Sequence, residues 1–362
     1  MRHIEHKPAP YSQTAPRAGI NGSEPATAFI VNPGSSGGST GKNWENINSQ
    51  LRAALGLDGR VGVAFCRKGG DGTSLARQFL KKGYSRIVAI GGDGTINEVA
   101  NGFFERIDVG KKDAINKIDQ AQLVALQKQL PLKAINPDAV LIPVPCGTRN
   151  VLARSLGLPL TFEEYCANFA KLKPARMDLI AASTTSLAGN PKTFARVFLN
   201  AAEIGLGAEI ISRSKKVRNR LKSRLVSTTA AVVATLPLYQ SNLCKIYTDR
   251  RLQGIVANMT MTVISNGPYL GGGFRVAPDA SVSDGMLDVV ILKNSGSFKI
   301  LEDLVSLKLK DPSTDKDILY TQAKSVYIES EQRQVSVTVD GELIGTLPAI
   351  FRIIPSAISV MR

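Results

Sequence analysis

The chain has 362 residues, 43% of them hydrophobic, so it is long enough for two domains with separate cores and too apolar for general disorder. Lys and Arg number 45 against 30 Asp and Glu, and the charge of +15 favours an anionic partner: nucleic acid, a nucleotide or an acidic membrane face. Both histidines, His3 and His6, lie at the start of the chain, which excludes Ser-His-Asp and Cys-His sites from the folded body and disfavours a His-based zinc site. A general base must then be Asp or Glu, or less readily Lys, Tyr or Cys.

The four cysteines are typical of a reducing compartment. Cys66, Cys146, Cys166 and Cys244 lie far apart and form no CxxC pair, as expected of reduced thiols in a cytosolic protein. We find no signal peptide and no apolar run of about 20 residues that would span a bilayer. We therefore expect a cytoplasmic protein.

The first part of the chain alternates strands and helices. Residues 1–25 are rich in Pro, Ser, Ala and charge without periodicity, and we expect a flexible tail there. The predicted elements are strands at 27–31 and 60–65, a glycine and hydroxyl loop at 32–39, and a helix at 74–82. Such alternation implies right-handed crossovers, a parallel sheet, and ligands beyond the carboxyl ends of the strands. We expect an α/β nucleotide-binding domain over residues 26–160.

Residues 86–103 combine a strand, a glycine turn and a helix. The β-branched run 87–90 predicts a buried parallel strand, and the turn 91–94 has three glycines that permit positive φ and leave room for a ligand. The helix that follows has apolar residues at i, i+3, i+4 and i+7, namely Ile96, Val99, Ala100 and Phe103. Backbone N–H groups and the positive end of the helix dipole predict an anion site at this turn. Because Asp93 would repel a bare phosphate, we expect Mg²⁺ between its carboxylate and the phosphates.

The alternative for this turn is a glycine-rich connection with an Asp cap. Residues 69–73 spell the same Gly-Gly-Asp-Gly-Thr pentapeptide, so the letters alone do not identify a ligand site. The copy at 91–95 is better placed, because it follows a strong strand and opens a strongly periodic helix. We expect the copy at 69–73 to cap the helix at 74–82.

The rest of the first domain contains an insertion and a third loop at a strand end. Residues 105–138 are charged and Gln-rich with a helical pattern at 118–130, and we expect a surface insertion. A strand at 140–144 leads into the loop 145–150, Pro-Cys-Gly-Thr-Arg-Asn, and then into a short helix at 151–156. Three strand-end loops of small and hydroxyl residues are what a shared nucleotide cleft requires. The chain has no GxxxxGK[ST] P-loop and no GxGxxG after its first strand.

Beyond residue 160 the pattern changes to strands without regular helices. This change predicts a second, mainly antiparallel β-rich domain at 161–345, which we expect to bind the acceptor. The predicted strands lie at 196–200, 243–248, 257–265, 287–292, 325–329 and 334–339. An ordinary amphipathic helix is predicted at 298–308.

A basic helix interrupts these strands at 208–238. Its first half contains seven cationic side chains: Arg213, Lys215, Lys216, Arg218, Arg220, Lys222 and Arg224. The apolar half that follows is broken by three threonines and is too short to span a bilayer. One interpretation is a helix that lies on an anionic membrane, and the other is a solvated charged face beside ordinary core packing. The two interpretations have about equal weight.

Two carboxylates near the C-terminus, Asp340 and Glu342, flank Gly341 between two strand-like runs. A common Asp-Gly hairpin turn would explain them. In a body without histidine, however, two such carboxylates are also the kind of base that an enzyme needs to activate a hydroxyl group.

Five blocks of the sequence, in order, resemble the diacylglycerol kinase catalytic-domain family, and especially its soluble bacterial diacylglycerol and lipid kinases. The blocks are Asn32-Pro33 with its Gly-Ser loop, 91–102, 145–154, 271–288 and 339–342. The resemblance runs from about Ala28 to the C-terminus. It implies a nucleotide-binding α/β domain, a larger β-rich domain, and a C-terminal segment at 346–362 that returns to the first domain. It also implies transfer of the γ-phosphoryl group of ATP to a lipid hydroxyl.

The resemblance implies roles for individual residues as well. The nucleotide would be held by Asn32, Gly34, Ser35, Gly92, Asp93, Gly94, Thr95, Asn97, Glu98 and Thr148, with Cys66 close to it. Glu342, with Asp340 beside it, matches the catalytic base. A structural Mg²⁺ site is implied by the carbonyl groups of Ser281 and Met286 and the carboxylate of Asp284, and hard oxygen ligands of this kind suit Mg²⁺.

Two residues depart from the family pattern. Cys66 stands where bacterial relatives often have Thr near the nucleotide, and Val151 follows Asn150 where many members have Asp. The chemistry itself needs positioning and charge neutralisation more than covalent catalysis. Glycine turns would bring N–H donors to the phosphates, Mg²⁺ beside Asp93 would offset charge, and Glu342 or Asp340 would take the hydroxyl proton. We expect diacylglycerol as the acceptor lipid, with phosphatidylglycerol and sphingoid bases as alternatives.

Two other functions compete with a lipid kinase. NAD kinase shares the Gly-Gly-Asp-Gly turn, but the blocks 145–150 and 271–288 disfavour it. A non-catalytic membrane or nucleic-acid binder would explain the charge, although no RNA- or DNA-reading motif accompanies it. We expect ATP, Mg²⁺ and a lipid acceptor as ligands, peripheral docking on an anionic membrane, and no nucleic acid; a homodimer is left open.

Overall fold

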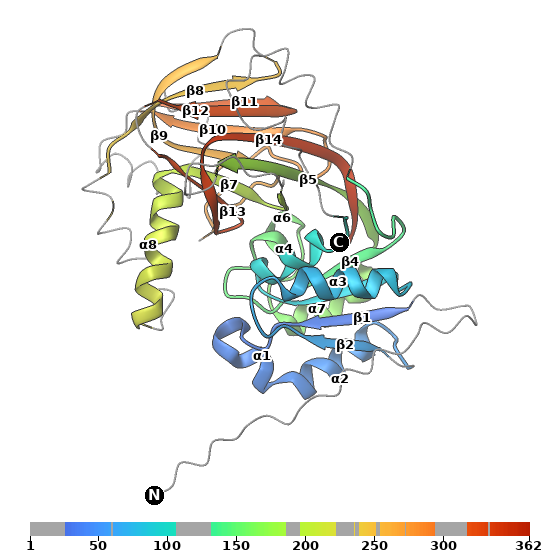
Figure 1. Ribbon diagram of the computed structural model, residues 1–362. Helices are drawn as coiled ribbons and strands as arrows, with labels where there is room; N and C mark the ends of the chain where they lie inside the picture. Colours follow the sequence, from blue (N-terminus) through green and yellow to red (C-terminus); the bar gives the residue numbers. More distant parts are fainter. Residues whose placement is uncertain are drawn as a thin grey trace, which may run out of the picture.

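The chain folds into two lobes. The computed structural model describes residues 26–58, 61–105, 132–185, 196–221, 235, 239–250, 254–271, 273–293, 317–331 and 334–362. Figure 1 shows an α/β lobe that carries the first strands and, above it, a β-rich lobe from which the long helix α8 (Leu206–Leu221) extends downward. The expected order, an α/β domain followed by a β-rich domain, is confirmed.

Four strands form the sheet of the α/β lobe in the order β4-β3-β1-β2. They are β1 (Thr27–Val31), β2 (Gly62–Phe65), β3 (Arg86–Gly91) and β4 (Val140–Pro145). Strand β1 pairs in parallel with β2 and β3, and β3 pairs in parallel with β4. Their carboxyl ends therefore lie at one edge of the sheet, where the loops that follow them meet.

Helices cover both faces of this sheet and explain why β1, β3 and β4 are almost entirely buried, whereas the edge strand β2 is partly exposed. The helical segments are η1 (Ser35–Gly38), α1 (Ser39–Lys42), α2 (Trp44–Ala54), α3 (Asp71–Lys81), α4 (Asp93–Asn101), α6 (Val151–Ser155), α7 (Phe162–Asn168) and η3 (Phe169–Lys171). Alternate residues of β1 separate the two cores: Ile30 packs with α3 and α4, and Phe29 packs with α2 and α7. Two helical layers leave only the strand ends open to a ligand.

The β-rich lobe is built from antiparallel pairs. Its strands are β5 (Pro174–Thr185), β6 (Arg196–Phe198), β7 (Ala201–Gly205), β8 (Asn242–Thr248), β9 (Ile255–Ser265), β10 (Leu287–Lys293), β11 (Ile318–Ala323), β12 (Ser325–Ser330), β13 (Ser336–Val339) and β14 (Glu342–Met361). Buried apolar side chains from the inner faces of these strands, Phe198 and Phe351 among them, form a core separate from those of the α/β lobe.

The last strand, β14, connects the lobes. Its beginning pairs with β13 in a hairpin, its middle pairs with β5 and β12, and its end pairs in parallel with β4 through Ser359 and Val360. One hydrogen-bonded path of strands consequently runs from β11 in the upper lobe to β2 in the lower lobe. The hairpin turn that starts β14 is thereby fixed relative to the parallel sheet.

The structure also corrects several sequence-based expectations. The helix expected at 74–82 begins three residues earlier, at Asp71, because Gly70 is its N-cap, with φ of +87°. Strand β5 was missed because nine consecutive buried residues, 177–185, hide the alternation that identifies a half-buried strand. Helix α7 was missed as well, although Thr161 accepts a hydrogen bond from the Glu164 N–H in a capping-box spacing that would have revealed it.

Some expectations lie outside the described residues. These are the tail at 1–25, the helical part of the insertion (106–131), the second half of the basic helix beyond 221, and the helix at 298–308. In the part of the chain that is described, no helix is both long and apolar enough to cross a bilayer.

Candidate functional site

Three loops converge at the carboxyl edge of the parallel sheet. At the end of β1, the Asn32 side chain donates to the Thr95 hydroxyl over 2.8 Å and accepts the N–H of Gly34 over 3.0 Å. The Ser36 hydroxyl donates to the carbonyl of Cys146 over 3.0 Å. The loops after β1, β3 and β4 are therefore joined by direct hydrogen bonds, as a shared cleft requires.

Glycines allow these loops to approach one another and leave space in front of α4. A Cβ on Gly147 would lie 2.5 Å from the Cα of Gly92, so the two loops are in backbone contact there. A Cβ on Gly91 would lie 2.7 Å from Thr95. By contrast, a Cβ on Gly94, in the first turn of α4, would meet no protein atom within 4 Å. This open side of the turn can admit a ligand.

Asp93 connects the start of α4 with that of α6. The N-cap of α4 is Gly92, which has no side chain to cap the first N–H groups of the helix. Asp93 lies in the first turn, and its Oδ1 accepts the N–H of Leu152 over 3.0 Å. The helix thus presents uncapped donors and one anchored carboxylate at the same point.

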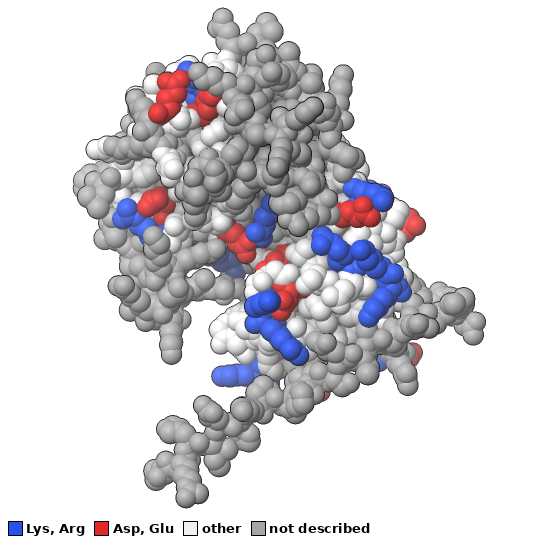
Figure 2. All heavy atoms as spheres, viewed as in Figure 1, with Lys and Arg blue, Asp and Glu red and all other residues white. Residues whose placement is uncertain are grey.

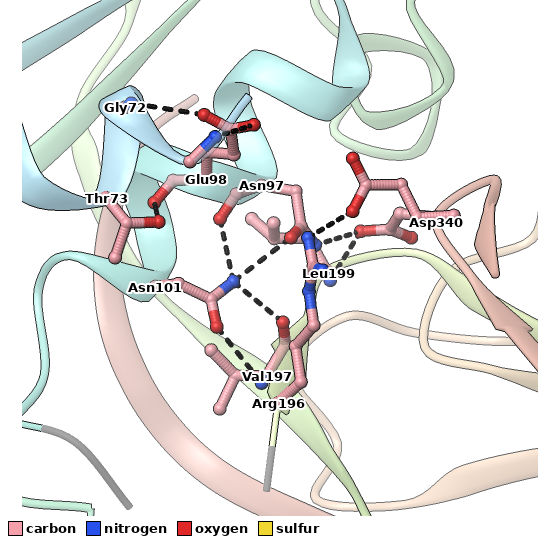
Figure 3. A network of polar contacts seen from close by, with 11 residues as sticks. Gly72, Thr73, Asn97, Glu98, Asn101, Arg196, Val197, Leu199 and Asp340 are labelled. Atoms are coloured by element: carbon pink, nitrogen blue, oxygen red, sulfur yellow. Dashed lines mark hydrogen bonds and ion pairs between the residues drawn. The ribbon is translucent and has the colours of Figure 1, made fainter. Parts of the chain in front are cut away.

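The turn between β13 and β14 packs against α4 through Asp340. Figure 3 shows the Asp340 carboxylate facing Asn97 and the segment at Leu199. Its Oδ2 accepts the Asn97 amide over 2.6 Å and the Leu199 N–H over 3.0 Å, and its Oδ1 accepts the N–H groups of Asn200 and Ala201 over 3.0 and 3.1 Å. Burial raises the pKa of Asp340, while these four donors act in the opposite direction.

The backbone of this turn explains why the sequence has Asp-Gly there. Asp340 and Gly341 both have positive φ, 44° and 77°, as in a type I′ hairpin, and Val339 pairs with Glu342. The hairpin interpretation is therefore confirmed, and the same turn also lies against the candidate cleft.

Two further side chains on the polar side of α4 hold neighbouring segments. Asn101 exchanges hydrogen bonds with the backbone of Val197 in β6, donating over 2.8 Å and accepting over 3.2 Å. The Glu98 carboxylate accepts the N–H groups of Gly70 and Gly72 over 2.8 and 3.1 Å (Figure 3). The first Gly-Gly-Asp-Gly-Thr copy is thus bound to the helix that the second copy opens.

Glu342 begins β14 and forms an ion pair with Arg196 at the start of β6. About a third of each side chain is exposed, 33% for Glu342 and 36% for Arg196, so solvent can reach this carboxylate. Figure 2 shows acidic and basic side chains next to one another where the two lobes meet.

The structure shows what surrounds three further residues that the resemblance assigns to nucleotide binding. The Ser35 hydroxyl is buried and donates to the carbonyl of Asn32 and to Thr40. Burial raises the pKa of the Cys66 thiol to about 12, and the charges of Glu98 and Asp71 add to the effect, so the thiol stays protonated. Thr148 is exposed in the third loop.

The loop 281–286 leads into β10 of the β-rich lobe. Asp284 Oδ1 accepts the N–H of Met286 over 2.9 Å, and the buried Asp178 accepts the N–H of Gly285 over 2.7 Å. Burial, followed by the charges of Asp284 and Asp279, raises the pKa of Asp288 to about 6. Its Oδ2 is buried without a hydrogen-bond partner. No described group of three His, Cys, Asp or Glu side chains is arranged for a metal.

Sequence reasoning did not single out several residues whose contacts arise only when distant segments are brought together by the fold. Arg196 and Glu203 lie in strands that no motif marks, and Arg149 was seen only as a member of a loop. Asn101 could have been found, since Asn97 and Asn101 are one helical turn apart on the same side of α4.

Family comparisons match both lobes. The diacylglycerol kinase catalytic domain profile matches residues 26–182, and the YegS C-terminal NAD kinase beta sandwich-like domain profile matches residues 201–362. The diacylglycerol kinase of Bacillus subtilis is 26% identical over 291 residues, which are 78% of this chain and 79% of the relative. A Pseudomonas putida protein named "Probable lipid kinase YegS-like" is 27% identical over 324 residues, 86% of this chain and 90% of the relative.

A solved structure has the same fold. The crystal structure of a diacylglycerol kinase from Bacillus anthracis superposes with a TM-score of 0.62 at 22% sequence identity, covering 93% of this chain and 96% of that chain. At this identity the likeness concerns the fold alone.

The different surroundings of Asp340 and Glu342 lead to a stability prediction. Asp340→Ala leaves three backbone N–H groups and one amide without their acceptor, and we expect the free energy of unfolding to fall by about 3 kcal/mol. Glu342→Ala removes a partly exposed ion pair and should cost less than about 1 kcal/mol. Urea denaturation of the two variants measures both values, and equal losses would contradict this assignment.

Proposed function

The chain belongs to the diacylglycerol kinase catalytic-domain family, and on that premise we propose that this kinase transfers the γ-phosphoryl group of ATP to the hydroxyl group of diacylglycerol. One observation supports the proposal above all others. The three strand-end loops meet at the start of α4, and Asp340 holds the carboxylate-bearing turn of β14 against the same helix. N–H donors for phosphate thus lie at the start of α4, and a candidate base for the acceptor hydroxyl lies beside the β13–β14 turn that packs against this helix.

The proposed nucleotide site is the open side of the first turn of α4. The uncapped N–H groups after Gly92 and the positive end of the helix dipole attract phosphate oxygens. The empty space at Gly94 lets phosphate approach the backbone closely. Asn32 and Thr95 fix the neighbouring loops through their mutual hydrogen bond. The side chains of Ser35, Glu98 and Asn97 help to hold the loops around this site in place, because their polar groups already form hydrogen bonds with protein atoms.

The carboxylate of Asp93 fits a cation that accompanies the phosphates. Its Oδ1 is held by the N–H of Leu152, which orients the group and leaves Oδ2 as a hard oxygen ligand. Mg²⁺ in this position would offset the negative charge that develops on the transferring phosphoryl group.

Glu342 is the proposed base for the acceptor hydroxyl. Both oxygens of Asp340 already accept two hydrogen bonds each, so that carboxylate is better suited to positioning the turn. Glu342 lies two residues further, is partly exposed, and is oriented by Arg196. Proton acceptance by Glu342 as the hydroxyl oxygen attacks phosphorus would raise the nucleophilicity of that oxygen.

A structural Mg²⁺ in the loop 281–286 is the second metal in the proposal. Asp284 would contribute a carboxylate and Ser281 and Met286 their carbonyl oxygens, a donor set that suits Mg²⁺. The buried, unpartnered Oδ2 of Asp288 supports a cation nearby, since a positive charge would compensate for the missing donor.

The proposed acceptor comes from an anionic membrane. Figure 2 shows Lys and Arg side chains gathered over α3, whose basic members include Arg77 and Lys81. Helix α8, which also has a basic sequence, extends from the acceptor lobe (Figure 1). Basic surfaces of this kind favour peripheral binding to anionic lipids.

The decisive experiment is a kinase assay with labelled ATP, Mg²⁺ and mixed micelles of one acceptor at a time. We expect labelled phosphatidate from diacylglycerol, and less product from phosphatidylglycerol, a sphingoid base or NAD. Preference for another lipid alcohol would correct the acceptor and keep the reaction. Absence of label in every acceptor would count against the kinase reaction itself.

The roles of Glu342 and Asp93 predict a loss of turnover without a loss of fold. Glu342→Gln and Asp93→Asn keep the shape of each side chain but remove the negative charge. We expect kcat to fall by at least about a hundredfold in each variant, with circular dichroism unchanged. Wild-type kcat in Glu342→Gln would remove that residue from the base role.

The two pentapeptide copies provide a matched test of the nucleotide site. Gly94→Ala introduces a methyl group into open space at negative φ, so we expect unchanged thermal stability but a KM for ATP raised by about tenfold or more. Gly69→Ala in the other copy meets Glu98 only at an ordinary contact distance of 3.8 Å and should leave both quantities unchanged. Equal KM values in the two variants would contradict phosphate binding at Gly94.

A further inference from the structure

One cation where the two lobes meet, that of Arg149, has no part in the mechanism above. Arg149 lies in the loop 145–150 after β4, between the exposed Thr148 and the buried Asn150, and its own side chain is exposed. This loop is one of the three that converge at the start of α4. An exposed cation on such a loop can contribute charge to a phosphate site.

The backbone around Arg149 is fixed against the proposed phosphate site. Asn150 closes the loop by accepting the N–H of Gly147 over 2.9 Å. Gly147 in turn lies against Gly92, the N-cap of α4. A little further along the chain, the N–H of Leu152 binds the carboxylate that is proposed to hold Mg²⁺. The segment that carries Arg149 is therefore anchored on both sides to the first turn of α4.

The side chain of Arg149 extends from this loop to the β-rich lobe. A Cβ added to Gly271, in the segment after β9, would lie 2.9 Å from Nη1 and 3.8 Å from Cζ of Arg149. Glycine at position 271 thus leaves room for the guanidinium group. Helix α6 approaches the same segment, since a Cβ on Gly267 would lie 2.8 Å from the hydroxyl oxygen of Ser155. The guanidinium group therefore lies where the loop of one lobe faces the segment 267–271 of the other.

The electrostatic environment links Arg149 to the turn that carries the proposed base. Burial raises the pKa of Glu203 in β7 to about 7, while the charge of Arg149 lowers it and that of Asp340 raises it. Asp340 begins the turn that leads to Glu342. The guanidinium group and this turn are thus both within electrostatic range of the same carboxylate.

The proposed reaction needs positive charge between the phosphate loops and the acceptor. Phosphoryl transfer spreads negative charge over the oxygens of the moving group, and Mg²⁺ and cationic side chains offset it. The carboxylates of Asp93 and Asp340 add negative charge to the same region. Arg196 is engaged in an ion pair with Glu342. A further guanidinium group suits the task, because its planar set of N–H donors matches two phosphate oxygens at once.

We propose that Arg149 contacts the γ-phosphoryl group of ATP from the side of the acceptor lobe and stabilises the charge on this group during transfer. This inference rests on the proposed function and adds a catalytic residue to it. The bond from the γ-phosphorus to the bridging oxygen breaks, and ADP leaves with the electron pair. A bond from phosphorus to the lipid oxygen forms, and the hydroxyl proton goes to Glu342. Arg149 stays protonated and donates hydrogen bonds throughout.

Equilibrium binding isolates the contact with the γ-phosphoryl group, because ADP lacks this group. The probes are ADP and β,γ-imido-ATP, a non-hydrolysable analogue, each titrated with Mg²⁺ into the wild-type protein and Arg149→Gln. We expect the Kd of the analogue to rise about tenfold or more in the variant, and the Kd of ADP to stay within about twofold. Arg149→Lys keeps the charge without the planar donors and should give an intermediate Kd for the analogue.

Turnover should fall more than affinity does, since the contact strengthens in the transition state. With diacylglycerol micelles and saturating ATP, we expect the kcat of Arg149→Gln to fall by about a hundredfold or more, with an unchanged KM for diacylglycerol. Arg275→Gln is the matched control. Arg275 is an exposed arginine of the β-rich lobe that donates to the carbonyl of Pro278 over 3.0 Å, and its variant should keep the wild-type Kd and kcat.

The pattern of losses separates a phosphate contact from a structural role. Equal losses of affinity for ADP and the analogue in Arg149→Gln, or no loss for either, would overturn the proposal. If the wild-type protein bound neither nucleotide, the proposed function and this role of Arg149 would both be refuted. Binding of both nucleotides without transfer to any acceptor would refute the lipid kinase reaction alone, because the comparison of ADP with the analogue would still decide the contact.

Discussion

The partly buried carboxylate of Asp340, with its four hydrogen bonds, is the interaction on which the relation between the two lobes depends. A charge removed from water costs several kcal/mol unless other donors replace the water. Here the N–H groups of residues 199–201 and the amide of Asn97 replace it, and they come from both lobes. Any displacement of the β13–β14 turn from α4 would leave this charge poorly solvated. Separating the hairpin from the helix would therefore cost the free energy of solvation that these donors supply to the Asp340 carboxylate, and this cost holds the two elements together.

This constraint places structural and chemical demands on one short turn. The type I′ geometry needs positive φ at two successive residues, which Asp and Gly tolerate well. Asp340 then supplies the partly buried anchor, and Glu342 follows at the first position of β14 with an accessible carboxylate. A side chain is positioned best when a neighbouring polar group with all its hydrogen bonds made fixes the backbone. The strand that Glu342 begins also ends at β4, so the turn is tied to the parallel sheet at a second point.

The sequence predicted those features whose cause is local. Strands β1, β3 and β4 and the periodic helix α4 follow from hydrophobic pattern and glycine position, and the structure has them within a few residues. The long strand β14 was not predicted, because its buried runs at 344–347 and 349–353 remove the alternating pattern. The partners of Asp340 were not predictable either, since Asn97 lies 243 positions away in the chain. Local patterns identify which residues can do chemistry, whereas the contacts that orient them depend on the assembled lobes.

The distribution of hydrogen bonds separates the carboxylates of the cleft into two kinds. Those that accept backbone N–H groups, such as Asp340 and Glu98, have their lone pairs committed to the fold and serve to fix its loops. A carboxylate that is to receive a proton or a hydrogen bond from a substrate must retain unused acceptor capacity, which Glu342 has through its partial exposure. Family motifs do not make this distinction, because the same residue type meets both needs. It follows from counting donors around each oxygen.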